Sequence, residues 1–136
     1  MAQNKEIFLT MKALQIIQSA YRCTVEEQDD PVVWFAQVLQ NNGGEIDILL
    51  RGNAVNYVIS GQDSTGLSFG SWKQTQSAKL DLDLTDCINN GLGVYIISED
   101  AKDRAIPTDK IISGVKSISR SELPVLFEQY EQIWHW

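Results

Sequence analysis

The sequence predicts an α/β fold, in the form of a single three-layer domain whose mostly parallel central sheet is flanked by helices. Short apolar segments rich in Ile, Leu and Val alternate along the chain with segments whose apolar residues recur every three to four positions. Strands that alternate with helices in this way form a parallel sheet that is covered on both faces. The length of 136 residues suits one domain with a core of its own.

Three main strands and two shorter ones are predicted. The main strands are expected at residues 12–19, 45–50 and 94–97, and the shorter ones at residues 110–112 and 115–118. Residues 1–11 are expected to form an N-terminal extension, so that the domain itself spans residues 12–136.

Helices are predicted between these strands and after them. The first begins at Pro31, because proline is tolerated at a first helical position, and its apolar stripe runs to Leu39, before a stop at residues 42–44. The others are expected at residues 54–59, from 80 to a stop at 90–91, at 99–103, and from 123 to the end of the chain.

The last helix has the longest apolar stripe, which comprises Leu123, Leu126, Phe127, Tyr130, Ile133 and Trp134. Two serines compete as its N-cap. With Ser121 in that position, Pro124 is the third helical residue and its missing N–H costs little. With Ser119 it is the fifth, where a hydrogen-bonded N–H is required. We therefore expect Ser121 to be the N-cap, although Ser119 and Glu122 have the spacing of a capping box.

A segment from residue 61 to residue 78 shows no periodicity and is expected to be a long loop. Loops of this length inside a small domain are uncommon and often functional. Phe69 and Trp72 lie in it, and Trp72 is expected to cover a site or an interface. Trp134 and Trp136 are expected to pack against the domain or to mediate assembly.

The composition excludes several classes of function. A net charge of −7 disfavours binding to nucleic acid and to anionic membranes, because phosphates select Lys and Arg. No apolar run approaches the ~18 residues of a membrane-spanning helix, and the N-terminus has no signal-peptide pattern. These features predict a cytoplasmic protein. One histidine and two cysteines make a histidine triad or a multi-histidine metal site improbable, and no cofactor is predicted.

Four stretches occur in the order and spacing of a known family: LQIIQSAYRC, WFAQVLQNNGGEIDILLRGNAV, LTDCINNGLGVYIISEDAKDRAI and ISRSELPVLFEQYEQIW. Together they resemble the DsrE/DsrF/DsrH family, which includes the Tus sulfur-relay proteins. The resemblance implies a small α/β domain that assembles into oligomers, with a site on the loop after the third strand. Active members carry a cysteine there that accepts sulfur as a persulfide. The two corresponding positions in this chain are Ile97 and Asp100, and neither is a thiol.

The resemblance and this departure from it lead to the main functional hypothesis. The chain is expected to be a non-catalytic subunit of a homo-oligomer or of an assembly with related subunits, or a small-ligand-binding protein, connected with intracellular sulfur relay. One alternative is a sulfur-carrier or redox enzyme that uses Cys23, whose pKa the neighbouring Arg22 would lower. A further alternative is a protein-interaction module that recognises a partner through the long loop.

A binding site for a small polar ligand is predicted at the carboxyl ends of the strands, which meet at one edge of a parallel sheet. The expected ligand-binding residues are Tyr21, Arg51, Asn53, Ser98 and Arg104. Alternatively, Ser98 only caps the next helix, and Asp100 and Arg104 form a surface ion pair four residues apart. The carboxylates of Glu99 and Asp100 would oppose a thiolate there and repel an anionic ligand. Arg51 could equally bind a neighbouring subunit.

The remaining polar residues have structural interpretations. Cys87 lies on an apolar helix stripe and is expected to be a buried, unreactive thiol. Asp81, Asp83 and Asp86 lack the glycine and the final glutamate of a calcium loop, so they are expected to be a solvated helix start and not a metal site. The acidic residues between the first strand and the first helix are expected to form a solvated loop: Glu26, Glu27, Asp29 and Asp30.

Overall fold

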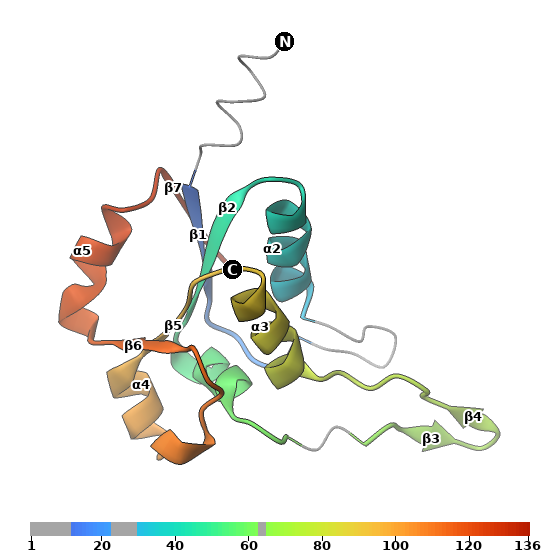
Figure 1. The fold of residues 1–136 in the computed structure, drawn as a ribbon. Helices are drawn as coiled ribbons and strands as arrows, with labels where there is room; N and C mark the ends of the chain where they lie inside the picture. Colours follow the sequence, from blue (N-terminus) through green and yellow to red (C-terminus); the bar gives the residue numbers. More distant parts are fainter. Residues whose placement is uncertain (1–11, 23–29, 63–64) are drawn as a thin grey trace, which may run out of the picture.

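The computed structural model describes residues 12–22, 30–62 and 65–136, and it confirms the predicted fold class. Its centre is a five-stranded sheet in which every pair of neighbouring strands is parallel, in the order β6-β5-β2-β1-β7 (Figure 1). The strands are β1 (Lys12–Ile17), β2 (Glu45–Leu50), β5 (Val94–Ile97), β6 (Lys116–Ile118) and β7 (Gln132–His135). The predicted extension, residues 1–11, lies outside the described residues.

Helices connect these strands and cover both faces of the sheet (Figure 1). The α-helices are α2 (Pro31–Asn41), α3 (Leu80–Asn89), α4 (Ser98–Asp103) and α5 (Leu123–Phe127). The 3-10 helices are η1 (Gly52–Val58), η2 (Thr108–Lys110) and η3 (Arg120–Glu122). Within the described part of the chain, no helix is both long and apolar enough to cross a membrane.

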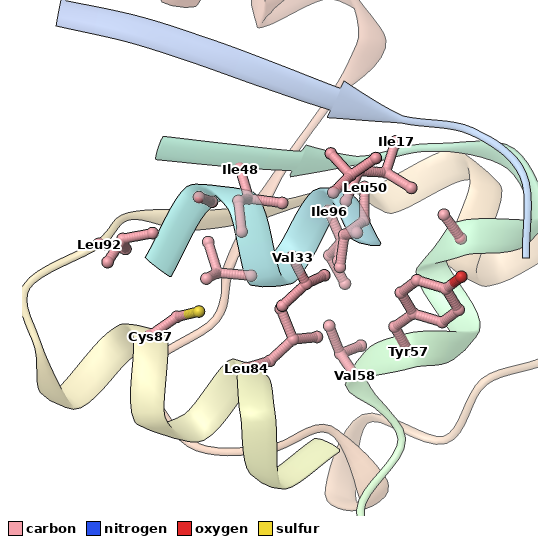
Figure 2. Packing of buried hydrophobic residues seen from close by; sticks show 14 of the residues in the cluster. Ile17, Val33, Ile48, Leu50, Tyr57, Val58, Leu84, Cys87, Leu92 and Ile96 are labelled. Atoms are coloured by element: carbon pink, nitrogen blue, oxygen red, sulfur yellow. The ribbon is translucent and has the colours of Figure 1, made fainter. Parts of the chain in front are cut away.

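Side chains of each strand alternate between two cores, one on each face of the sheet. The larger core lies between the sheet and α2, α3 and η1, where Ile17, Ile48, Leu50 and Ile96 of the strands face Val33 of α2 and Leu84 of α3 (Figure 2). The smaller core contains strand residues of the opposite parity together with α5 and the residues that follow it: Leu14, Ile16, Leu49, Ile97, Leu126 and Tyr130.

The prediction of one long C-terminal helix was wrong beyond Phe127. The helix ends there, and residues 132–135 form β7, which pairs with β1 in the register Ala13↔Gln132 to Ile16↔His135. The pairing satisfies the backbone groups on the outer side of β1, which would otherwise be an exposed sheet edge. Ile133 and Trp134 suit a strand as well as a helix, so the apolar spacing could not separate the two structures.

Ser119, and not Ser121, begins the helical segment before Pro124. Ser119 and Glu122 form a capping box, in which the backbone N–H of Ser119 donates to the Glu122 carboxylate at 2.7 Å. The conflict with Pro124 is avoided because the segment starts as the 3-10 helix η3 and becomes an α-helix only at Leu123. Proline then occupies the second position of α5, where no hydrogen-bonded N–H is needed.

The predicted loop at residues 61–78 contains regular structure. A short antiparallel hairpin, β3 (Ser68–Phe69) and β4 (Trp72–Lys73), extends from the domain beside α3 (Figure 1). Gly70 has a φ of +58° at the turn, a conformation that glycine adopts without strain. The predicted strand at residues 110–112 was also wrong: Ile111 makes only an isolated antiparallel bridge with Ile59 after η2.

A cluster of polar groups fixes the chain just before β7. The Tyr130 hydroxyl donates to the carboxylate of Asp47 on β2, which also accepts from the Gly93 N–H at 2.6 Å. Lys12 lies 3.8 Å from this carboxylate and over the Tyr130 ring. Burial raises the pKa of Tyr130, and the hydrogen bond to Asp47 raises it further, so the phenol remains a donor.

Candidate functional site

All four arginines of the chain follow strands of the sheet. They lie on the side where the carboxyl ends of the strands meet, here called the carboxyl edge. Arg22 comes after β1, Arg51 after β2, Arg104 after β5 and its short helix α4, and Arg120 after β6. In a parallel sheet these loops lie at one edge, so four separate parts of the sequence bring a guanidinium to the same side of the domain.

Asp100 links three of these loops. Its buried carboxylate accepts hydrogen bonds from the Gly52 N–H at 2.8 Å and from the Arg120 guanidinium. Burial alone would raise the pKa of Asp100, but these two bonds and the charge of Arg120 outweigh it and hold the pKa below its usual value. The alternative prediction, a surface ion pair between Asp100 and Arg104, was wrong.

Two of the predicted ligand-binding residues, Asn53 and Arg104, are in direct contact. The Arg104 guanidinium donates to the Asn53 side-chain oxygen from Nε at 3.0 Å and from Nη2 at 2.9 Å. It also donates to the backbone carbonyl of Asp100 at 3.2 Å. All of these acceptors are neutral, so the hydrogen bonds orient the Arg104 side chain without a carboxylate to neutralise its charge.

Ser98 and Glu99 form a second hydrogen-bonded group at this edge. Ser98 is the first residue of α4 and not its N-cap, which corrects the structural interpretation of that residue. Its hydroxyl donates to Glu99 at 2.8 Å, and the Arg120 backbone N–H donates to both Glu99 oxygens, at 2.9 and 3.1 Å. The bond from the Arg120 N–H, followed by the one from Ser98, lowers the pKa of Glu99.

Arg51 and Arg22 differ from the other two arginines. Both side chains are half-buried, and among the described residues neither guanidinium has a hydrogen bond or an ion pair. The backbone N–H of Arg51 donates to the Ile17 carbonyl at 3.0 Å, and this bond fixes the start of the loop against the end of β1. Gly52 then takes a φ of +56°, which directs its own N–H to Asp100.

A buried carboxylate supports the loop that carries Tyr21 and Arg22. Asp30 has no exposed surface, caps α2 through the Val32 N–H at 2.8 Å, and accepts from the Tyr57 hydroxyl at 2.7 Å. The exposed Tyr21 ring packs against Tyr57, with ring centroids 5.3 Å apart. The prediction that Asp30 is solvated was therefore wrong. The other acids of that run, Glu26, Glu27 and Asp29, lie outside the described residues, as does Cys23.

The aspartates at the start of α3 are only partly solvated. Asp81 is buried and accepts from the Gly61 N–H at 2.9 Å, which corrects the prediction for that residue. Asp83 is half-buried and Asp86 is exposed. Over residues 12–22, 30–62 and 65–136, no group of three or more His, Cys, Asp or Glu side chains is arranged to hold a metal ion.

Cys87 is buried in the larger core, as predicted (Figure 2). Burial raises the pKa of its thiol to about 11, against the opposing hydrogen bond with Gln37. At about pH 8 the thiolate fraction is then roughly a hundredfold below that of an ordinary cysteine. We expect a Cys23→Ala variant to resist alkylation by iodoacetamide until it is unfolded, as followed by mass spectrometry. Rapid modification of the folded variant would contradict this assignment.

The low pKa of Asp100 predicts a dependence of stability on pH. A carboxyl group whose pKa falls on folding stabilises the protein above its unfolded pKa and loses this effect as pH falls through the folded value. We expect Asp100→Asn to lower the free energy of unfolding by about 1–2 kcal/mol at neutral pH. The difference from the wild type should shrink below about pH 4 in urea titrations.

The exposed Asp103→Asn is the matched control, with little expected effect at either pH. A difference for Asp100→Asn that persists undiminished at low pH would contradict the role assigned to its carboxylate.

Sequence reasoning missed Arg120 and Gly52 as parts of this edge, and it considered Arg22 only for its effect on Cys23. A signal for two of them was present in the sequence. Each of the four arginines follows a predicted strand, whereas none lies inside a predicted helix stripe. The contribution of the Gly52 N–H has no comparable signal, because it depends on backbone direction.

No protein-family model matches this sequence, and no curated protein matches it. Solved structures do. The YchN protein from E. coli superposes with a TM-score of 0.67 at 14% identity, over 93% of this chain and 100% of that one. A conserved protein of unknown function from Bacteroides thetaiotaomicron gives 0.62 at 14% identity, over 92% and 95% of the two chains. A protein of unknown function from Methanobacterium thermoautotrophicum gives 0.62 at 12%, over 90% and 97%. The chain therefore has the same fold as YchN, an α/β domain built on a parallel five-stranded sheet.

Proposed function

We propose that this chain binds a small oxyanion, a carboxylate or a phosphate, at the carboxyl edge of its sheet, as a non-catalytic DsrE-like protein related to intracellular sulfur relay. The observation that carries the proposal is the placement of all four arginines at this edge. Arginine presents a planar fork of donors that matches carboxylate and phosphate oxygens, and it is the residue of choice for this recognition.

Both acids at the edge are held by groups of the protein, and one of them is neutralised by an arginine. The carboxylate of Asp100 is paired with Arg120 and the Gly52 N–H, and Glu99 accepts from Ser98 and the Arg120 N–H. The expected repulsion of an anion therefore falls away for Asp100, whose charge Arg120 balances, whereas Glu99 keeps its charge because its donors are neutral. Three guanidinium groups, those of Arg22, Arg51 and Arg104, have no carboxylate within ion-pair distance among the described residues.

Asp100 itself illustrates the chemistry of the edge. A carboxylate of the protein is held there by one arginine and one backbone N–H, the donor types that an external oxyanion would use. The overall charge of −7 favours a small ligand over a nucleic acid, whose many phosphates would meet the acidic remainder of the surface.

The non-catalytic assignment rests on the positions where the resemblance implies cysteines. Ile97 is buried in the smaller core, and the Asp100 carboxylate is engaged by hydrogen bonds, so neither offers a nucleophile. The connection with sulfur relay rests on the sequence motifs and on the shared fold.

A thermal-unfolding screen tests the proposal. Sodium phosphate and sodium acetate are compared with sodium chloride at matched ionic strength. A ligand that binds only the folded state stabilises it by about 2.7 kcal/mol at a hundred times its Kd. We expect at least one of the two oxyanions to raise Tm in a saturable manner. If neither raises Tm beyond the chloride control, the proposal is wrong.

A further inference from the structure

The carboxyl edge continues beyond the arginines to the end of β7, where the only histidine of the chain lies. His135 is exposed, and its Nε2 lies 3.0 Å from the side-chain oxygen of Gln18, the residue that follows β1. An amide oxygen only accepts hydrogen bonds, so Nε2 carries the hydrogen of this bond. Nδ1 is then the nitrogen that gains a proton on acidification, and the bond to Gln18 is retained when it does.

The strand register places His135, Gln18 and Arg51 on the same face of the sheet. Ile16 belongs to the smaller core, His135 is its partner on β7, and Gln18 lies two positions after it on β1. Side chains two positions apart on a strand share a face. Arg51 continues β2 in an extended conformation, with φ of −133° and ψ of 165°, two positions after Leu49 of the same core.

Gln18 lies between the end of β7 and the loop that begins with Arg51. A Cβ on Gly52 would be 3.4 Å from the Gln18 Cγ, and the Gln18 carbonyl accepts from the Ala54 N–H at 3.2 Å. Neighbouring strands are about 4.8 Å apart, so the ends of β2 and β7, with β1 between them, are about 10 Å apart. A small oxyanion beside Gln18 would therefore have the Arg51 side chain on one side and His135 on the other.

The charges around His135 leave it available to a ligand. Among the described residues, no carboxylate lies within ion-pair distance of its ring. Of the elements packed beside it, α5 has no charged side chain and β1 has only Lys12, at the opposite end of the sheet. The acids in the other loops of the edge include Glu99, Asp100 and Glu122, and each of them accepts a backbone hydrogen bond.

We propose that His135 is a further binding residue of the oxyanion site and makes its affinity depend on pH. Histidine gains its charge as pH falls from about 8 to about 5, so acidification adds a second cation opposite Arg51 and binding becomes tighter. The inference rests on the proposed function, because it concerns the same ligand.

Calorimetric titrations at about pH 6 and about pH 8 test the effect on affinity. The probes are sodium sulfate and sodium acetate, because both keep their charge over this range. Ionic strength is matched with chloride, and the protein carries no histidine tag. Wild type is expected to bind at least one probe about three- to fivefold more tightly at the lower pH. His135→Gln keeps a polar side chain without the charge, so it should bind equally at both pH values and like the wild type at the higher one.

The matched control moves the histidine to the other end of the same strand. His135→Gln combined with Gln132→His has the composition of the wild type, and position 132 is also exposed. The imidazole then lies at the amino end of β7, away from the arginines, so the pH dependence is not expected to return.

Nuclear magnetic resonance gives a second readout, because one histidine gives one titrating ring signal. A ligand that the protonated form binds more tightly must in turn favour that form. Saturating probe is therefore expected to move the midpoint of the His135 titration to higher pH than chloride does at equal ionic strength. Arg51→Ala should reduce this displacement.

The possible failures separate the two proposals. If the wild type binds a probe with equal affinity at both pH values, the role assigned to His135 is wrong and the proposed function stands. The same conclusion follows if His135→Gln, or the variant with the relocated histidine, retains the pH dependence. If neither probe binds at either pH, the proposed function is wrong and this inference falls with it.

Discussion

Replacing Asp30 with alanine is expected to lower the free energy of unfolding by about 3 kcal/mol, because its buried carboxylate both caps α2 and accepts a hydrogen bond from Tyr57. It caps α2 through the Val32 and Val33 N–H groups, at 2.8 and 3.4 Å. It also accepts from the hydroxyl of Tyr57 at 2.7 Å, a bond between two fully buried side chains. The loss of a cap costs about 1 kcal/mol, and the loss of a buried hydrogen bond to a charged group costs about 1.5–3 kcal/mol.

Urea unfolding measures this effect, with Asp30→Asn as the matched control. Asparagine is also a good N-cap and retains one oxygen, so a clearly smaller loss is expected. Tyr57→Phe should cost less stability in the Asp30→Ala background than in the wild type, because the hydrogen bond that the two side chains share is already lost there. A loss below about 1 kcal/mol for Asp30→Ala would contradict the described role of the carboxylate.

Replacing Arg51 with alanine is expected to weaken the binding of a small oxyanion by about ten- to a hundredfold. Hydrogen bonds to a charged group contribute about 1.5–3 kcal/mol, which corresponds to this range. The guanidinium makes no hydrogen bond or ion pair among the described residues, so stability should change little. Calorimetric titration with the oxyanion identified by thermal unfolding, in parallel with urea unfolding, separates the two effects.

Two variants control for charge alone. Arg51→Lys keeps the charge but loses the planar fork, so an intermediate affinity is expected. Lys110→Ala removes one positive charge from an exposed position in η2 and should leave the affinity unchanged apart from a small, salt-sensitive loss. An equal loss in Arg51→Ala and Lys110→Ala would mean that binding is non-specific attraction.

Local patterns predicted much of the fold. The strands at 45–50 and 94–97 are short apolar runs bounded by turn residues, and the stripes of α2 and α3 fall within single windows of about ten residues. β7 was not predictable in this way, because it is a strand only through its pairing with β1, more than a hundred positions earlier in the chain. The apolar spacing from Leu123 to Trp134 is compatible with a helix, so it led to the wrong prediction for β7.

The candidate site, like the fold, was predictable only where local patterns or topology determine it. Topology brings the loops after parallel strands to one edge of the sheet. The predicted residues that lie in these loops are Arg51, Asn53, Ser98 and Arg104. Their partners depend on contacts distant in sequence. The pairing rule for residues four apart favoured Asp100 with Arg104, whereas the fold pairs Asp100 with Arg120.

The sequence around Asp30 contains a signal for its structural role. It stands directly before Pro31, and an aspartate before a proline is typical of a helix start. Its place in a run of acidic residues favours a solvated loop instead. Its burial against Tyr57 depends on the position of η1, which no local pattern specifies.

The most direct test of the arginine site is nuclear magnetic resonance of the arginine side chains. With four arginines in the chain, the Nε–H groups give four assignable signals, all from the proposed edge. Phosphate or acetate is titrated at constant ionic strength maintained with chloride. Oxyanion binding predicts that the Arg51 signal shifts with saturation, accompanied by those of Arg22 or Arg104, and that Arg51→Ala removes saturation from the remaining signals. Shifts that stay linear in anion concentration and are alike for all four arginines would contradict a binding site at this edge.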